Sequence, residues 1–263
     1  MFQQERQDKI LQYINAHKNV RTKDLSRIFK ASMVTIRADI NELDKKGLIV
    51  KVHGGALAIA DRINLEIPSQ SKMRLNSAEK RIIGKLAADM VEENDVILID
   101  SGTTTLEVAR ALRNKKVTVI TNDIQIGALI ASDTRGNITL IVTGGTVEAN
   151  TFTLCGIETL NFLKRIKVNK LFMGCDAIDP QRGVSNRTLI EAGIKREMMA
   201  VSEKVIAVLD SSKHNKEVFI HVCDISEIDV LVTDRISAHN RELFGQAGVE
   251  IVTPYVEQDN KTV

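Results

Sequence analysis

The chain has 263 residues, of which 43% are hydrophobic and 27% charged, with 36 Lys and Arg against 34 Asp and Glu. These proportions are typical of globular proteins and exclude wholesale disorder, and the length suits one large α/β domain or two unequal domains. Because aromatic residues make up only 3% of the chain and Trp is absent, the core must be built from aliphatic side chains.

The sequence shows no pattern of export or membrane insertion. Met1 is not followed by a basic and then an apolar segment, and no apolar run approaches the roughly 20 residues that span a bilayer. Three cysteines, Cys155, Cys175 and Cys223, lie far apart, which argues against a disulfide framework or a local zinc site. We therefore expect a cytoplasmic protein without membrane contact, cofactor or metal.

Residues 1–60 predict three helices followed by a hairpin. The helices are expected over 6–16, from an N-cap at Thr22, and from an N-cap at Ser32 to about Gly47; Leu25, Ile28 and Phe29 have the spacing of a buried stripe. A strand over 48–52 then turns back into 56–59. The segment holds eleven Lys and Arg and six Asp and Glu, a balance of +5 that leaves −3 for the remainder. A basic head on a slightly acidic body suggests that only the head binds a polyanion.

This arrangement is typical of a helix-turn-helix DNA reader with a wing. The third helix would enter the major groove by its N-terminal half, and the hairpin would reach a neighbouring groove or the backbone. The candidate DNA-binding residues are Thr22, Ser32, Met33, Thr35, Arg37, Lys51 and His53. A helical domain with a merely solvated basic face, or a protein-interaction module, is the alternative.

Residues 61–77 lose the apolar periodicity around Pro68 and predict a linker, and residues 78–263 predict a second domain. After a helix over 78–91, apolar runs alternate with helical patterns. Strands are expected over 96–100, 117–121, 138–143, 170–174, 205–210, 218–222, 230–233 and 249–252, and helices over 104–112, 124–131, 157–163, 190–199 and 238–247. Strands that are apolar throughout and alternate with helices indicate an α/β fold with a parallel sheet covered on both faces.

Small polar residues follow several of these strands. Since the carboxyl ends of parallel strands share one edge of a sheet, these residues predict a ligand site there. The turn Ser101-Gly102-Thr103-Thr104 precedes a helix, so its free amides and hydroxyls suit an anion, and Lys213 on a neighbouring loop could balance the charge. The turn is not a P-loop, and many such turns are plain helix caps.

The head contains three specific segments: Arg6-x3-Ile10-x3-Ile14, residues 32–40 (SMVTIRADI) and residues 51–56 (KVHGGA). The first two closely resemble the helix-turn-helix of the DeoR-type (deoxyribose-operon repressor) family, and the third looks like its wing. Members commonly carry a second basic residue where this chain has Ala38. Blocks in the body, at residues 100–104, 121–122, 144–145, 174–177, 183–184 and 210–213, match the family's effector-sensing domain, so the resemblance covers nearly the whole chain.

The resemblance implies a winged helix-turn-helix followed by a sensor domain similar in fold to ribose-5-phosphate isomerase and glucosamine-6-phosphate deaminase. It implies a homo-oligomeric repressor of a carbohydrate-utilisation operon that binds duplex operator DNA and is released by a phosphorylated sugar. The implied effector-binding residues are Asp100, Ser101, Gly102, Thr103, Thr104, Thr121, Asn122, Gly144, Gly145, Asp176 and Lys213.

An isomerase- or deaminase-like enzyme with an appended DNA-binding domain is the alternative function. It needs a carboxylate base, and the available polar groups are Asp176, Asp179, Glu191 and Lys213. Holding sugar hydroxyls is the simpler role for Asp176, and Glu191 with Lys195, four apart on a helix, predicts a surface ion pair. The histidines outside the wing form no cluster. We therefore predict no catalytic residue and no metal site.

Overall fold

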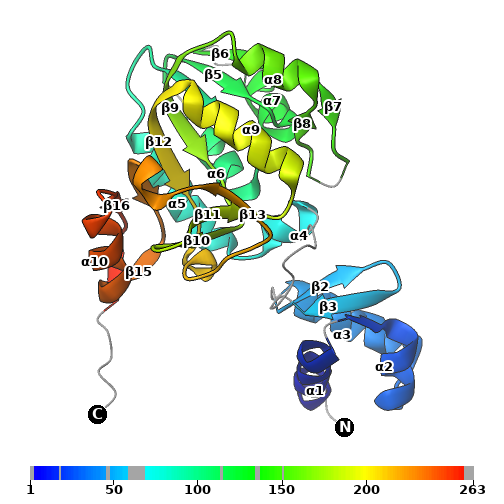
Figure 1. The fold of residues 1–263 in the computed structure, drawn as a ribbon. Helices are drawn as coiled ribbons and strands as arrows, with labels where there is room; N and C mark the ends of the chain where they lie inside the picture. Colours follow the sequence, from blue (N-terminus) through cyan, green and yellow to red (C-terminus); the bar gives the residue numbers. More distant parts are fainter. Residues whose placement is uncertain are drawn as a thin grey trace. The chain divides into compact units, whose positions relative to one another are not determined.

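The computed structural model describes residues 3–17, 19–45, 48–58, 69–112, 115–133, 137–149 and 151–257 (Figure 1). The chain divides into two compact units, residues 1–77 and 78–263. Each unit has its own hydrophobic core, and each is described separately below. No described helix has the length and apolar character needed to cross a membrane.

The first unit contains the three predicted helices. They are α1 (Gln3–His17), α2 (Thr22–Ile28) and α3 (Met33–Lys45). Their shared core consists of fully buried aliphatic side chains, namely Ile10, Ile14, Leu25, Ile36, Ile40 and Leu43. The predicted stripe on α2 was only partly right, because Leu25 is buried whereas Ile28 is 44% exposed. Seven residues make two turns, and α2 therefore offers the core only a narrow face.

A three-stranded antiparallel sheet completes this unit, in the order β1–β3–β2. The predicted hairpin is β2 (Ile49–Val52) and β3 (Gly55–Ala58), while Ile59 lies outside the described residues. Strand β1 (Asn19–Arg21) was not predicted, since only one of its three side chains, Val20, is buried. It pairs with β3 at Gly55, where a Cβ would come within 2.2 Å of the Val20 carbonyl oxygen.

The prediction that Thr22 caps the second helix was wrong. Thr22 is the first helical residue, the N-cap is Arg21, and no side chain caps this helix. The Thr22 side chain is buried, and its backbone N–H donates to the Gly54 carbonyl at 2.9 Å. The tip of the hairpin thus satisfies an amide that a side-chain cap would otherwise serve.

The second unit is built on a seven-stranded sheet in the order β16–β14–β12–β9–β4–β5–β6, with every neighbouring pair parallel. Seven of the eight predicted runs form it. The strands are β4 (Val96–Ile99), β5 (Val117–Thr121), β6 (Ile138–Val142), β9 (Val168–Met173), β12 (Ser202–Val208), β14 (Val230–Val232) and β16 (Glu250–Val252). Their buried, uninterrupted apolar runs are the reason that the pattern predicted them.

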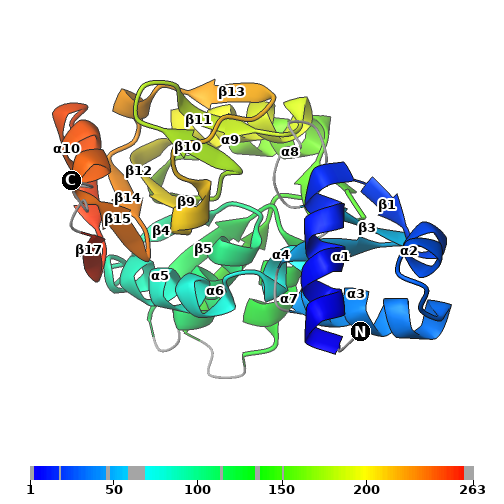
Figure 2. The ribbon, with the colours of Figure 1, turned by 90° about the horizontal axis from the view of Figure 1, so that it is seen from below.

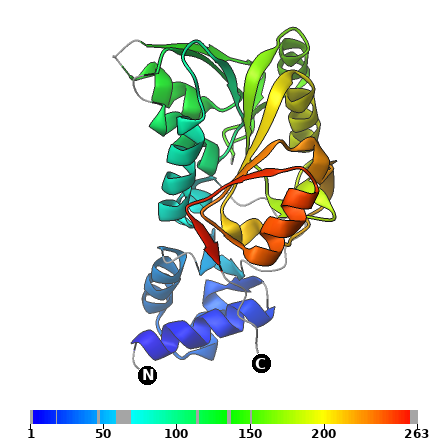
Figure 3. The ribbon, with the colours of Figure 1, turned by 90° about the vertical axis from the view of Figure 1, so that its left-hand side faces the viewer.

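Helices cover both faces of this sheet. Figure 2 shows α5 (Ser77–Asp89), α6 (Thr103–Ala111) and α7 (Ile124–Ala131) on one face, and α8 (Ile157–Leu163) and α9 (Leu189–Ala200) on the other. Figure 3 shows the same layers from the side, with α10 (Ala238–Gln246) beside the β16 end. The two edge strands depart from the predicted burial: Ile141 and Val142 of β6 are more than a third exposed, and Ile251 and Val252 of β16 are only partly buried.

The eighth predicted run does not join the parallel sheet. It forms β13 (Ile220–Cys223), which pairs antiparallel with β11 (Gly183–Asn186) in a small sheet that also contains β10 (Ala177–Asp179). The exposed His221 interrupts its apolar character, which is a signal of a half-covered strand.

Several short elements were not predicted because two to six residues carry too little periodicity. They are α4 (Ser69–Arg74), which lies in the predicted linker 61–77, and the strands β7 (Thr146–Val147), β8 (Leu154–Cys155), β15 (Arg235–Ser237) and β17 (Tyr255–Glu257). The linker residues 61–68 lie outside the described part of the chain.

A buried carboxylate joins helices α1 and α3. Asp39 accepts hydrogen bonds from Arg6 Nε at 2.5 Å and from Gln7 Nε2 at 3.3 Å, and its side chain is 1% exposed. At the other end of α3, Asp44 accepts the Lys51 backbone N–H at 2.9 Å and so fixes the hairpin. Two acids on the inner face of α3 therefore set its orientation.

We predict that Asp39→Ala lowers the local unfolding free energy of α1 and α3 by about 3 kcal/mol, because Arg6 loses the carboxylate that compensates its partly buried charge. Hydrogen–deuterium exchange of peptides covering residues 3–17 and 33–45 measures this change. Glu42→Ala is the matched control, since Glu42 pairs with Lys45 on the exposed side of the same helix. Equal exchange in the two variants would contradict the prediction.

Candidate functional site

The first turn of α3 is closed by its own hydroxyls. Ser32 Oγ accepts the Thr35 backbone N–H at 3.1 Å and lies 2.8 Å from Thr35 Oγ1, so the predicted N-cap is confirmed. The contact between the two hydroxyls ties together two of the predicted DNA-binding side chains. Both hydroxyls are therefore engaged in hydrogen bonds within the first turn of α3.

The outer face of α3 presents Met33, Val34, Arg37 and Ala38, all exposed, while Ile36 and Ile40 hold the inner face in the core. Lys51 and His53 are exposed on the hairpin. Thr22, in contrast, is buried at the start of α2 and presents no side chain to a ligand on this surface. Val34 and Ala38 were not predicted; the signal for them was the i, i+4 spacing that places both on the face opposite Ile36 and Ile40.

In the second unit, the carboxyl ends of β4, β5, β6, β9 and β12 share one edge of the sheet, as their polar endings predicted. This edge, called the carboxyl edge below, brings together Asp100, Asn122, Gly144 and Asp176 from four different strand ends. Lys213, in the short helix Ser211–Lys213, reaches the same edge and donates from Nζ to the Cys175 carbonyl oxygen at 2.5 Å.

An unpredicted ion pair lies beneath this edge. Lys195 Nζ contacts Asp100 Oδ2, both side chains are at most 5% exposed, and Asp100 Oδ2 also accepts the Gly174 N–H at 3.1 Å. Burial opposes the charge of Lys195, but the carboxylates of Asp100 and Glu191 outweigh it and raise the pKa of Lys195. The prediction that Glu191 and Lys195 form a surface ion pair was therefore wrong: α9 turns Lys195 inward toward β4.

A second ion pair occupies the neighbouring strand end. Arg187 Nη1 lies 2.9 Å from Asp176 Oδ1, with side-chain exposures of 14% and 6%. Next to it, Asn186 Nδ2 donates to Glu191 Oε2 at 2.7 Å. Arg187 and Asn186 were not predicted, since they precede α9 in a segment without periodicity, and no signal in the sequence linked them to Asp176.

The turn before α6 has the geometry of an anion site. Gly102 is the N-cap, with φ 152° and ψ 164° and no side-chain cap, so amides in the first turn of α6 lack a capping side chain. Part of the turn is already engaged: the Gly102 N–H donates to Asp123 Oδ2 at 3.3 Å, and Ser101 Oγ lies 2.5 Å from Thr153 Oγ1. Thr153 is a further residue of the site that the sequence did not predict.

Asn122 is the most informative residue of this edge. It is 1% exposed, and neither its Nδ2 nor its Oδ1 has a hydrogen-bonding partner among the described residues. Buried side-chain amides in native proteins are almost always paired, so an unpaired one points to a group supplied from outside the chain. Its donor and acceptor suit a polyhydroxyl ligand.

Other predicted effector residues have internal roles. Thr121 Oγ1 donates to the Ile99 carbonyl at 2.8 Å and accepts the Asp123 N–H at 3.1 Å. Gly144 and Gly145 have φ of 74° and 113°, and a Cβ on Gly145 would lie 2.4 Å from Thr159 Oγ1. The structure therefore explains Thr121 by its hydrogen bonds within the chain, and the two glycines by their backbone geometry.

Asp123 caps α7 and adjoins the turn. Its Oδ1 accepts the N–H groups of Gln125 and Ile126, at 2.7 and 3.1 Å. Burial, with a small contribution from the charge of Asp100, raises the pKa of Asp123 to about 6. This carboxyl group therefore titrates close to neutral pH.

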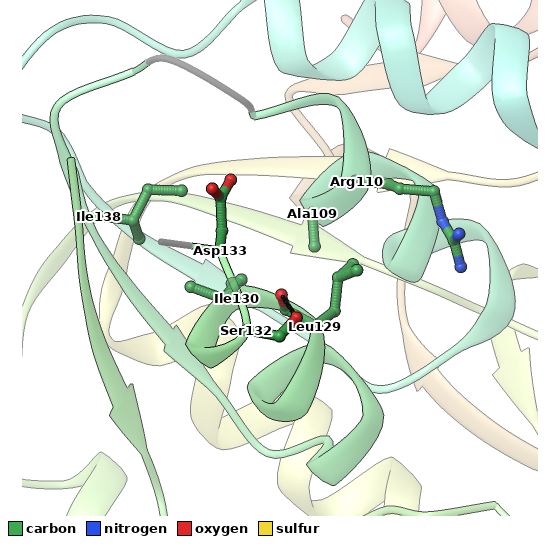
Figure 4. A pocket seen from close by; sticks show the side chains of 7 residues that line it. All are labelled: Ala109, Arg110, Leu129, Ile130, Ser132, Asp133 and Ile138. Carbon is green, nitrogen blue, oxygen red and sulfur yellow. Dashed lines mark hydrogen bonds between the residues drawn. The ribbon is translucent and has the colours of Figure 1, made fainter. Parts of the chain in front are cut away.

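Two described cavities lie away from the carboxyl edge. One of about 300 Å³ is lined by Ala109, Arg110, Leu129, Ile130, Ser132, Asp133 and Ile138 (Figure 4). It sits where α6 and α7 end and β6 begins, on the amino side of the strands. The other, of about 510 Å³, is lined by Arg196, Met199, Ala200, Val205, His221, Val222, Cys223 and Glu227. Neither cavity contains a predicted site residue.

Within the described residues, no group of three His, Cys, Asp or Glu is placed to bind a metal ion. Cys155, Cys175 and Cys223 are buried free thiols. Burial raises the pKa of the Cys175 thiol to about 11, so it remains protonated at neutral pH.

Comparison with known families matches residues 6–62 to the DeoR-like helix-turn-helix domain and residues 75–235 to the DeoR C-terminal sensor domain. The chain belongs to the DeoR family. It is accordingly a transcription regulator with an N-terminal DNA-binding domain and a C-terminal sensor domain of parallel-sheet α/β type, and the predicted family and fold class are confirmed. The regulator function also agrees, and the enzyme alternative is not favoured.

Curated relatives cover nearly the whole chain. The transcriptional regulator GolR of Listeria innocua is 32% identical over 95% of this chain and 98% of its own length. The L-fucose operon activator of Haemophilus influenzae is 31% identical, over 91% and 95%. The transcriptional repressor GlcR of Bacillus subtilis is 31% identical over 98% of each chain.

Solved structures show more distant similarity. The sorbitol operon regulator SorC of Klebsiella pneumoniae has a TM-score of 0.41 and 12% identity, covering 90% of this chain and 97% of its own. Ribose-5-phosphate isomerase A of Neisseria gonorrhoeae has a TM-score of 0.38 and 21% identity, covering 51% and 52%.

We predict that Asp123 makes the sensor domain less stable as the pH rises. Its folded pKa of about 6 lies above the ordinary value of 3.8, so the stability that it contributes is fully present below pH 4 and is lost as the pH rises through 6. Relative to Asp123→Asn, the unfolding free energy of the wild type should fall by about 2–3 kcal/mol between pH 4 and pH 7.

Urea unfolding of the full chain at several pH values measures this difference. Glu158→Gln is the control, because Glu158 is an exposed acid in the first turn of α8. Parallel pH profiles for the wild type and Asp123→Asn would show that the carboxyl group is not perturbed.

Proposed function

We propose that this chain represses a carbohydrate-utilisation operon and that a phosphorylated sugar releases it from operator DNA. The observation that carries the sensor half of this proposal is Asn122, a buried amide beside the Ser101–Thr104 turn that has no partner among the described residues. A phosphate would bind the turn amides, and the sugar hydroxyls would pair with Asn122 and Asp176. The relative named as an L-fucose operon activator supports a sugar-related role, and the relative named as a transcriptional repressor supports repression.

Lys213 is the cation proposed to bind the phosphate. Lys195 and Arg187 each face a carboxylate, so their charges are largely compensated. Lys213 donates to a neutral carbonyl, which leaves its charge available to an anion at the same edge. The same ion pairs weigh against catalysis, because Asp100 and Asp176 are held by cations rather than poised as bases.

The DNA-binding half of the proposal places α3 in the major groove. Met33 and Arg37 would face the bases, Ser32 and Thr35 would close the helix terminus, and the exposed Lys51 and His53 would contact the neighbouring backbone. A homo-oligomer, acting in the cytoplasm, would let two such helices read symmetric half-sites. Release requires that the effector bind more tightly to a state with lower operator affinity.

We predict that Asn122→Ala abolishes the response to the effector without loss of stability. The substitution removes an amide that has no partner among the described residues, so the free protein loses no described hydrogen bond. Thermal-shift measurements with a panel of pentose and hexose phosphates should show stabilisation of the wild type and at least a tenfold higher Kd for the variant. Operator affinity should stay unchanged.

Lys213→Ala tests the phosphate partner in the same assay, with Lys216→Ala as the neighbouring control. We expect loss of the response only in the first, since Lys216 is exposed and donates to the Ser212 carbonyl. A sugar phosphate that stabilised Asn122→Ala and Lys213→Ala to the same extent as Lys216→Ala and the wild type would disprove the proposed site.

For DNA, we predict that Arg37→Ala weakens binding to duplexes selected by the wild type by at least about tenfold, corresponding to the loss of one guanidinium contact. Fluorescence anisotropy at several salt concentrations measures the effect. Lys45→Ala, at the far end of α3, should have a smaller effect. Unchanged binding by Arg37→Ala would refute the placement of the recognition helix.

A further inference from the structure

The outer face of the recognition helix is mostly apolar. Val34 is 75% exposed in the first turn of α3, and Met33 beside it is 36% exposed. Ala38, one turn further on, is also exposed. The inner face of the same helix buries Ile36 and Ile40 in the core, so the apolar residues on the outside are not needed to fold the unit.

Helical spacing places Val34 and Ala38 next to Arg37. Residues four apart lie one above the other, and Arg37 at i+3 from Val34 lies on the same face. The hydroxyls of Ser32 and Thr35 bond to each other at 2.8 Å and are thereby drawn into the cap. The exposed side chains left to meet a ligand in the first two turns are Met33 and two small apolar groups, Val34 and Ala38, around the guanidinium of Arg37.

This set of groups matches a particular feature of duplex DNA. In the major groove the thymine C5 methyl group is the apolar recognition element, whereas an arginine is suited to guanine O6 and N7. The side chains of Val34 and Ala38 have no group that can bond a phosphate, so their contribution is assigned to apolar contact with base edges. We propose that Val34 and Ala38 each contact a thymine methyl group and thereby specify thymines that flank the base pair read by Arg37.

The proposal rests on α3 being the recognition helix. Charge supports duplex DNA as the occupant of this face, because residues 1–60, which include α3, carry a balance of +5. It also gives a reason for Ala38: a long basic side chain at that position would displace the small methyl surface and direct the helix to phosphate instead.

The test replaces single thymines by deoxyuridine, which removes only the methyl group. Duplexes are first selected from a random pool by the full-length wild type, and each thymine of a half-site is then replaced in turn. We expect two positions at which deoxyuridine weakens wild-type binding by about fourfold, the effect of losing one buried methyl group. Val34→Ala should lose the sensitivity at one position and Ala38→Gly at the other.

Controls separate this proposal from the placement of the helix. Ala38→Ser keeps the Cβ and should retain sensitivity to deoxyuridine, and Glu42→Ala should respond as the wild type does. If Arg37→Ala weakens binding but deoxyuridine is without effect at every thymine, the helix placement stands and the methyl contacts are refuted. Selected half-sites without thymine, or a Val34→Ala profile identical to the wild type, would equally overturn them.

Discussion

The buried contact between Asp100 and Lys195 joins the end of the interior strand β4 to helix α9. Neither side chain is more than 5% exposed, so either charge without the other would be strongly destabilising. Asp100 also accepts the Gly174 N–H at the end of β9, and one carboxylate therefore connects two strands and a helix. The turn that begins at Ser101 follows directly, and its position relative to the other strand ends is set by this contact.

The cations at the carboxyl edge have different partners and therefore different roles. Lys195 and Arg187 are matched to carboxylates and hold the strand ends in place. Lys213 is matched to a carbonyl and can exchange that neutral partner for an anion at lower cost. An anion bound at this edge as proposed would meet strand ends already joined by these ion pairs, which would reduce the ordering entropy that binding must overcome.

Local patterns in the sequence predicted most of the sheet, because parallel strands buried on both faces appear as uninterrupted apolar runs. Long-range pairing could not be predicted in the same way. Lys195 has Glu191 one turn away, and only the fold shows that it faces Asp100, 95 residues distant. Thr22 is likewise a residue type that commonly caps helices, but a hydrogen bond from its backbone N–H to the Gly54 carbonyl is formed instead. The turn at Ser101–Thr104 was predicted because its chemistry is local, whereas its contacts with Asp123 and Thr153 depend on neighbouring strands.

Net charge acts differently in the two domains. In the DNA-binding domain a balance of +5 provides attraction to any duplex, while the outer face of α3 is largely apolar. With α3 placed in the major groove as proposed, affinity and specificity would arise from different residues. The remainder of the chain is negative, and an anionic ligand gains nothing from the overall field. An anion bound at the turn as proposed would also meet Asp123, whose carboxylate accepts the Gly102 N–H. Because burial raises the pKa of that carboxyl group to about 6, most of the competing charge is present at pH 7 and is removed by protonation below pH 6. Binding of an anion at the turn and protonation of Asp123 must therefore favour each other by linkage.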